Sequence, residues 1–186
     1  YTYTFRFEVD VDAPSYTLKA GGYTISSGSY TNKQVVYTTT DNRSVYRIRY
    51  QRPNYSSYSN TYATSYTVNT SATNGWYYVY AEDYMGNTNS TVSFYLDTVL
   101  PIGTVTNANG STIENGGYTN KAIKYTASDS GSGMSGYQYK APDATSWSSY
   151  TSGTEVSGIG WHTFRSYDRA GNYSEEYKVY YDNTKP

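Results

Sequence analysis

The chain has 186 residues, a formal net charge of −1 and no cysteine. This composition excludes a disulfide framework, a thiolate metal site and a cysteine nucleophile, and nothing in it favours binding to nucleic acid. No apolar stretch approaches the length of a membrane span, so we expect no direct membrane insertion. Tyrosine stands out with 27 residues, whereas charged residues make up only 16% of the chain. A chain this rich in aromatic residues is expected to fold.

The first predicted element is a strand at the N-terminus, because its side chains alternate with a period of two. One side of residues 1–10 is formed by Tyr3, Phe5, Phe7 and Val9. The pattern, followed by Asp and Pro, returns at residues 92–101 and 177–186. We interpret residues 1–9 as the final strand of a preceding repeat or an extra N-terminal strand. The chain then reads as a segment of a longer tandem array.

Two repeats follow, predicted at residues 10–97 and 98–182, with residues 183–186 beginning a further linker. The first repeat has alternating segments at residues 15–19, 35–39, 45–51, 65–68, 75–83 and 91–96. The second has counterparts at residues 123–127, 137–140, 154–156, 160–168 and 177–181. With turn residues between them, these segments predict about seven strands per repeat. Two packed sheets would bury their one-sided faces, so the fold class is all-β, with two sandwiches arranged end to end.

One stretch anchors the alignment of the repeats, since Gly75-Trp76 and Gly160-Trp161 begin segments that lie 85 residues apart. Each segment ends in Asp, Gly and Asn, at residues 83, 86 and 87 and again at residues 168, 171 and 172. Asp can accept backbone hydrogen bonds that start a turn, and Gly can adopt the positive φ that the turn needs. The alternative role for these aspartates is metal ligation.

The motifs resemble bacterial immunoglobulin-like repeats of cell-surface and adhesin-type proteins. The resemblance is carried by Tyr-Thr-Asn-Lys at residues 118–121, Asp-Ser-Gly-Ser-Gly at 129–133, Asp-Arg-Ala-Gly-Asn at 168–172 and Asp-Thr-x-x-Pro at 97–101. The first repeat departs from the pattern at Asp41-Asn42-Arg43 and Tyr84-Met85. The resemblance implies two consecutive immunoglobulin-like β-sandwiches that serve as stalk, spacer or adhesive modules at a bacterial cell surface.

Aromatic side chains are the candidate ligand-binding residues. Alternation turns Tyr77, Val79 and Ala81 inward and leaves a row on the opposite face, namely Trp76, Tyr78 and Tyr80, with Tyr95 on the neighbouring strand. A second candidate patch lies in the hairpins, which carry Tyr55, Tyr58, Trp147 and Tyr150. Exposed rings can stack on sugars. For the row, the competing interpretation is cross-strand packing, helped by cation–π contacts with Arg47 and Arg49. For the hairpins, it is a solubilising loop whose rings fold over a sheet edge.

No metal site and no cofactor are assigned from the sequence. Asp10, Asp12, Asp97 and Asp182 lie at the predicted repeat boundaries, where they could hold calcium or simply form turns. The resemblance also raises a covalent Lys–Asn bond, with Lys33 or Lys121 joined to Asn87 or Asn172. Both lysines sit in polar Thr-Asn-Lys turns, which favours solvated side chains instead.

No catalytic arrangement is recognisable, so we expect a protein that is not an enzyme. The single histidine, His162, falls in the inward phase of its strand without a paired nucleophile. Two functions remain: a non-catalytic extracellular stalk, spacer or adhesive segment, or a carbohydrate-binding module. The expected partners are a host or environmental glycan or a surface protein, besides neighbouring repeats of the same chain.

Overall fold

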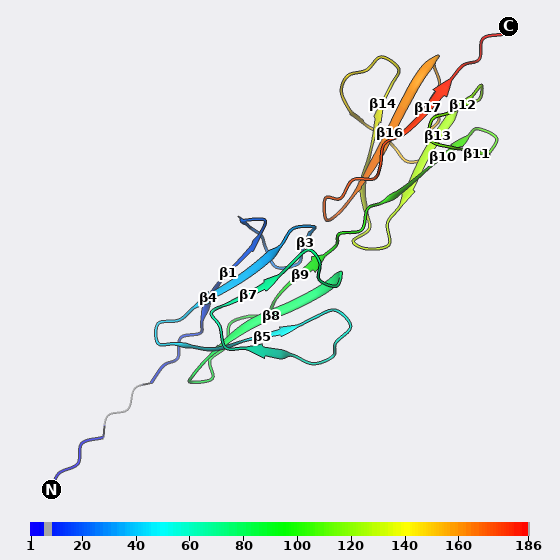
Figure 1. Ribbon diagram of the computed structural model, residues 1–186. Helices are drawn as coiled ribbons and strands as arrows, with labels where there is room; N and C mark the ends of the chain where they lie inside the picture. Colours follow the sequence, from blue (N-terminus) through cyan, green and yellow to red (C-terminus); the bar gives the residue numbers. More distant parts are fainter. Residues whose placement is uncertain (6–8, 186) are drawn as a thin grey trace. The chain divides into compact units, whose positions relative to one another are not determined.

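The computed structural model describes residues 1–5 and 9–185, and every regular element in them is a strand (Figure 1). The chain divides into two compact units, Tyr1–Leu96 and Asp97–Pro186. No element of the described residues is a helix with the length and hydrophobicity needed to cross a membrane. The predicted all-β fold class is confirmed.

The first unit is a sandwich of two sheets. One sheet has the order β2-β1-β4-β7, with β1 (Ser15–Ala20), β2 (Tyr23–Thr24), β4 (Val35–Thr40) and β7 (Ser65–Val68). The other has the order β3-β9-β8-β5-β6, with β3 (Ser29–Thr31), β5 (Val45–Gln51), β6 (Ser59–Thr61), β8 (Gly75–Asp83) and β9 (Val92–Leu96). In Figure 1, β1, β4 and β7 lie on one side of this unit and β5 and β8 on the other.

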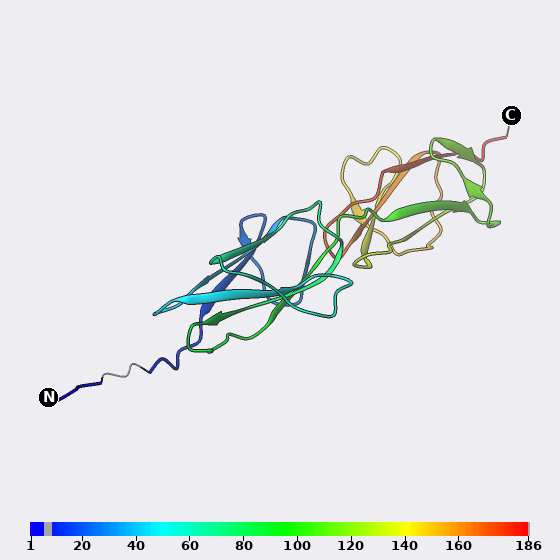
Figure 2. The ribbon, with the colours of Figure 1, turned by 60° about the horizontal axis from the view of Figure 1, so that its bottom comes forward.

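The second unit repeats this plan. Its smaller sheet has the order β11-β10-β13, with β10 (Ile102–Asn107), β11 (Thr112–Ile113) and β13 (Ile123–Ser128). Its larger sheet has the order β12-β17-β16-β14-β15, with β12 (Gly117–Thr119), β14 (Met134–Lys140), β15 (Ser148–Ser149), β16 (Gly160–Asp168) and β17 (Tyr177–Tyr181). Figure 2 shows the strands of both units from a second direction.

The order of the strands is that of an immunoglobulin-type sandwich, with a hairpin-linked long strand and last strand at the centre of the larger sheet. An early short strand pairs in parallel with the last strand in each unit, β3 with β9 and β12 with β17. All other strand pairs in the described residues are antiparallel.

Period-two alternation produces the core of each unit. Along β8, Tyr77, Val79 and Ala81 are at most 2% exposed, as the alternation predicts. Their partners in the first core are Leu18, Ala20, Val35, Tyr37, Ile48, Val68, Val92, Phe94 and Leu96. The second core contains Val105, Ile113, Ile123, Tyr125, Phe164, Val179 and Tyr181. Burial raises the pKa of the Tyr37 hydroxyl to about 12, although that hydroxyl accepts a hydrogen bond from Asn89 Nδ2 at 2.8 Å.

Two predicted strands differ from the structure. Residues 1–5 and 9–10 form no strand, and Phe7 lies outside the described residues. An alternating segment needs a partner ladder for its backbone groups, and no neighbouring strand pairs with these described residues. Residues 154–156 make only an isolated bridge, between Val156 and Ile123.

The repeated glycine before each tryptophan has a packing reason: at Gly75 (φ 134°) a Cβ would lie 2.8 Å from the Pro53 Cβ.

His162 is completely buried, as its inward phase predicts. Its Nδ1 lies 2.8 Å from the Tyr139 hydroxyl and its Nε2 lies 2.8 Å from the Gly158 carbonyl oxygen. A neutral ring satisfies both contacts, since Nε2–H can donate to the carbonyl while Nδ1 accepts from the hydroxyl. Burial lowers the pKa of His162, and the hydrogen bond to Gly158 only partly opposes this.

The second unit should therefore lose stability in acid through His162. A histidine with a lowered pKa in the folded state binds its proton more readily when unfolded, so its contribution is complete above about pH 6.5 and falls as the pH drops towards the folded-state pKa. Urea unfolding of the whole chain at pH 7.5 and pH 5.5 measures this loss. His162→Tyr, which installs the residue of the equivalent position in the first unit, should show a smaller difference between the two pH values. An equal difference in both proteins would contradict the assignment.

Candidate functional site

The turn that follows the long strand of each unit is closed by an aspartate. Asp83 Oδ1 accepts hydrogen bonds from the backbone N–H groups of Met85 and Asn87, both at 2.8 Å, and its Oδ2 accepts from Asn87 Nδ2 at 2.8 Å. Gly86 has a φ of 88°, as the predicted turn requires. Burial opposes ionisation of Asp83, but these hydrogen bonds outweigh it and hold the pKa of the carboxyl below its usual value.

The turn asparagine also holds the segment through which the chain enters the unit. Asn87 Nδ2 donates to the backbone carbonyl of Asp10 at 3.0 Å, a contact across 77 positions of sequence. In the second unit, Asn172 Nδ2 donates to the carbonyl of Asp97 at 2.9 Å and to Asp168 Oδ2 at 2.7 Å. We call this pair of asparagine hydrogen bonds the brace. It fixes the incoming chain against the β8–β9 turn in the first unit and against the β16–β17 turn in the second.

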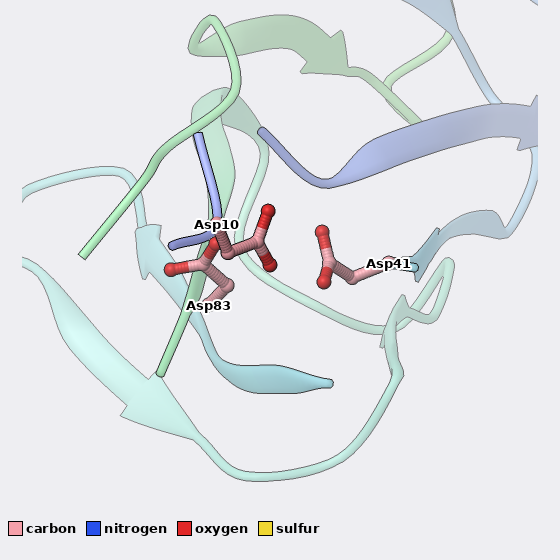
Figure 3. A group of neighbouring side chains, drawn as sticks. All are labelled: Asp10, Asp41 and Asp83. Carbon is pink, nitrogen blue, oxygen red and sulfur yellow. The ribbon is translucent and has the colours of Figure 1, made fainter. Parts of the chain in front are cut away.

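This brace brings together three aspartates that lie far apart in the sequence. In the first unit they are Asp10, Asp41 and Asp83, which we name the first aspartate cluster; one carboxylate oxygen from each lies within 4.8 Å of the others. Figure 3 shows the carboxyl group of Asp10 between those of Asp83 and Asp41. The second aspartate cluster consists of Asp97, Asp129 and Asp168 and meets the same distance limit.

The aspartate that each cluster takes from the β4–β5 or β13–β14 turn uses its two oxygens differently. Asp41 Oδ1 accepts from the backbone N–H groups of Arg43 and Ser44, at 2.9 and 3.1 Å, while its Oδ2 is buried and has no hydrogen-bond partner. Asp129 Oδ2 accepts from the N–H groups of Gly131 and Gly133, at 3.0 and 2.7 Å, while its Oδ1 is buried and unpartnered. One oxygen shapes the β4–β5 or β13–β14 turn, and the other remains available in the cluster.

In the second unit, Asp97 is completely buried and depends on a glycine. Its Oδ1 accepts from the Val99 N–H at 3.0 Å, and its Oδ2 accepts from the Ser132 N–H at 2.5 Å. A Cβ on Gly131 would collide with the Asp97 carboxylate. Gly131 therefore leaves the space that the carboxylate occupies.

The chemistry of the clusters is that of hard oxygen ligands. Even at the 4.8 Å limit, two unit charges would repel by roughly 3.5 kcal/mol at an effective dielectric constant of about 20. The ion pairs Arg47–Glu82 and Lys124–Glu155 lie outside both clusters. Three carboxylates in one place are suited to holding a cation, and nothing in their arrangement provides a nucleophile with its base.

The sequence draws attention to the individual aspartates of these clusters, but it does not show that they lie close together. The sequence predicts Asp10 and Asp97 at repeat boundaries and Asp83 and Asp168 in turns, whereas Asp41 and Asp129 stand out in it only as members of motifs. Asp12 accepts a hydrogen bond from Asn42 Nδ2 at 2.8 Å, and Asp182 holds its own turn through the Thr184 N–H at 2.8 Å. The signal that could have united the six was their common position in the two aligned repeats.

The predicted aromatic row on β8 lies away from the core, as expected. Trp76 meets Tyr95 edge to face, with ring centroids 5.4 Å apart, and the planes of Trp76 and Tyr78 are tilted by 30°. Tyr78 is 37% exposed. A surface hollow of about 350 Å³ has Tyr55 and Arg52 in its lining together with Trp76, Tyr78 and Tyr95. The rings thus line one hollow but do not form a flat row.

Other candidate rings are paired with cations. Arg49 lies over both Tyr58 and Tyr80, at 5.8 and 5.6 Å from the ring centroids, and these two rings meet edge to face. Arg52 lies 4.5 Å from the centroid of Tyr55. These contacts stabilise the sheet surface by stacking and cation–π attraction.

The aromatic residues of the second hairpin serve two different structural purposes. Trp147 contacts Arg165 at 4.2 Å and Lys140 at 4.4 Å from its ring centroid. Tyr150 packs against the second core, 5.4 Å from the ring of Phe164, and its hydroxyl donates to the Thr154 carbonyl. Tyr150 therefore belongs to the edge of the core, because its ring fills space between the sheets.

In the first unit, the structure separates the lysine and the asparagine that could be joined covalently. Lys33 is exposed and follows β3, whose Thr31 pairs with Leu96 at the Gly75 end of β8. Asn87 lies beyond the other end of β8, beside Asp83. The length of a nine-residue strand lies between the two ends, which amounts to roughly 25 Å, so this bond cannot form in the folded unit.

No known protein-family profile matches the chain, and no curated protein matches it. Among solved structures, the chain is similar to the fibronectin(III)-like modules of CbhA from Clostridium thermocellum, at 15% sequence identity and a TM-score of 0.42. This match covers 90% of the present chain and 94% of that chain. A likeness at this level assigns neither a family nor a function.

The Gly131 contact predicts a specific loss of stability. Gly131→Ala should lower the free energy of unfolding of the second unit by about 1–3 kcal/mol, because the methyl group must displace the Asp97 carboxylate. Calorimetry on the whole chain measures the change. Ser130→Ala, which alters an exposed side chain of the same turn, is the matched control and should change stability little. Equal effects of the two substitutions would show that the close approach is unimportant.

Proposed function

We propose that this chain is a non-catalytic structural segment, in which two immunoglobulin-type sandwiches act in series as a spacer. The observation that carries the proposal is the path of the chain through each unit. Asp10 meets Asp83 at one end of β8, whereas the last strand leaves from the other end, where Leu96 pairs with Gly75. In the second unit Asp97 meets Asp168, and Tyr181 pairs with Gly160. The chain therefore enters each unit at one end of its longest strand and leaves it at the other end.

The pairing of the last strand of each unit with an early short strand supports a mechanical role. β3 and β9 run in parallel, with Ser29 opposite Phe94 and Thr31 opposite Leu96. A pull on the last strand along its own axis slides β9 along β3, so the ladder bonds between these two strands are stressed together rather than one after another. β12 and β17 repeat this geometry. Such an arrangement suits a module whose task is to transmit force or hold distance.

The extracellular setting is also a proposal. It is supported by the resemblance of the repeats to bacterial surface modules and by a polar surface with few charges, since only 16% of the residues are charged. In this setting the chain would present other parts of its protein at a cell surface. Adhesion to a host or environmental partner is the finer variant of the same proposal.

A second function has a specific observation in its favour. The hollow of about 350 Å³ beside Trp76 combines rings with polar neighbours such as Gln51 and Asn54, a composition that can bind a sugar. Against it stands the edge-to-face contact of Trp76 with Tyr95, which leaves no broad stacking platform. We therefore rank carbohydrate binding second.

The spacer proposal predicts how the chain responds to force. When the whole chain is stretched by its two ends in a single-molecule experiment, two separate unfolding steps are expected. Extending the residues from Ser15 to Leu96 should release roughly 250–300 Å of chain per step, from about 3.6 Å per residue. A gradual extension without steps would contradict load-bearing units.

A glycan array decides between the two functions. The spacer proposal predicts no saturable binding by the whole chain. Trp76→Ala tests the hollow in the first unit, and Trp161→Ala at the equivalent position of the second unit is its matched control. Binding that is lost in the first variant and kept in the second would replace the spacer by the carbohydrate-binding module.

A further inference from the structure

Both units carry an aspartate cluster at the end where the chain enters, and we propose that each cluster binds one calcium ion. The ligands come from the incoming segment, from the turn after β4 or β13, and from the end of the long strand. In the first unit these are Asp10, Asp41 and Asp83 (Figure 3). The inference does not depend on the spacer proposal, because a carbohydrate-binding sandwich could hold the same ions.

The spacing of the oxygens fits the size of the ion. Calcium binds oxygen ligands at about 2.3–2.6 Å, so two ligands of one ion lie at most about 5 Å apart. In each cluster the three carboxylate oxygens lie within 4.8 Å of one another. An ion can therefore contact all three without a rearrangement of the backbone.

Buried oxygens without partners give a second, independent indication. Asp10 Oδ2, Asp41 Oδ2 and Asp129 Oδ1 each expose less than 1 Å² and accept no hydrogen bond. Buried carboxylate oxygens in proteins are nearly always satisfied by donors or by metal ions. The other oxygens of Asp41 and Asp129 are satisfied by the backbone, so the unpartnered ones are the atoms left for an ion.

The two units reach this arrangement through different local sequences. The turn after β4 reads Asp41-Asn42-Arg43, whereas the turn after β13 reads Asp129-Ser130-Gly131. In both turns the aspartate uses one oxygen for the backbone and leaves the other buried and free. A turn alone requires only the first oxygen, so the second oxygen needs another explanation, and a shared ligand provides it.

The ligand set selects calcium over other common ions. All of the clustered donors are carboxylate oxygens; the chain has no cysteine, and its one histidine is hydrogen-bonded to Tyr139. Zinc and copper prefer nitrogen or sulfur ligands, and magnesium requires a stricter octahedral shell that keeps its waters. A surface hollow of about 400 Å³ borders the first cluster, with Asp12 and Asp41 in its lining, and water held there would complete a calcium shell.

Calorimetric titration of the whole chain with calcium chloride tests the proposal directly. After removal of metal with EDTA and buffer exchange, we expect two ions per chain, with dissociation constants of about 10⁻⁴–10⁻³ M, as in other extracellular modules. Magnesium at the same concentrations should bind more weakly. Two calcium ions per chain support the proposal, whereas heats no larger than those of dilution would overturn it.

Isosteric variants locate the ions. Asp41→Asn and Asp129→Asn each keep an oxygen for the turn but replace the free oxygen by an amide group, so each should lose one of the two ions and the double variant both. Asp143→Asn is the matched control, because it removes the same charge at an exposed position whose φ of 63° asparagine tolerates. Calcium binding that is unchanged in the double variant would place the ions elsewhere and overturn the assignment.

Thermal unfolding separates a metal site from a purely structural cluster. In wild type, saturating calcium should raise the unfolding midpoint by roughly 10 °C. Without calcium the double variant should be at least as stable as wild type, because each cluster has lost one repelling charge; with calcium it should be less stable. Equal destabilisation of the variant in both conditions would show that the aspartates only shape their turns. If the double variant fails to fold, the wild-type midpoint with and without calcium still decides, and an unchanged midpoint would overturn the proposal.

Discussion

The asparagine side chain in the turn after the long strand connects the parts of each unit. Asn87 donates both to the Asp83 carboxylate, which closes the turn, and to the backbone carbonyl of Asp10. This pair of contacts joins the incoming chain to the turn between the last two strands. The position of Asp10 then brings its carboxylate to Asp41, so the aspartate cluster is a consequence of the brace. Asn172 has the same role in the second unit.

Tyrosine has two roles in these sandwiches. Inside, Tyr37 and Tyr125 fill the space between the sheets, and Asn89 or Ser166 satisfies their buried hydroxyl groups. Outside, Tyr58 and Tyr80 pack against each other beneath Arg49. A surface of this kind gains stability from ring contacts that do not depend on many charges. It therefore suits a chain with a net charge of −1 and many uncharged polar residues.

Each aspartate cluster lies where the chain enters its unit, at a segment that belongs to no strand. The incoming segment makes few ladder contacts of its own, since residues 9–14 form no strand. In the first unit this segment is attached through the Asp10 carbonyl and the Asp12 carboxylate, whereas in the second unit it is attached through the carbonyl and the carboxylate of Asp97. An ion bound to the carboxylates would join this segment to two turns at once. Stability of each unit would then respond to the calcium of its surroundings.

The sequence by itself determined the all-β class, the two repeats, most of the strands and the inward phase of Tyr77 and His162, because these depend on period-two alternation and on local turn chemistry. Residues 1–5 and 9–10 alternate but form no strand in the structure, since a strand forms only where another strand pairs with it. Alternation also did not reveal that Tyr150 packs against the core, because hairpin rings can turn either way. Only the tertiary structure brought Asp10, Asp41 and Asp83 together. Their proximity comes from hydrogen bonds between segments dozens of residues apart, and no local pattern encodes such a contact.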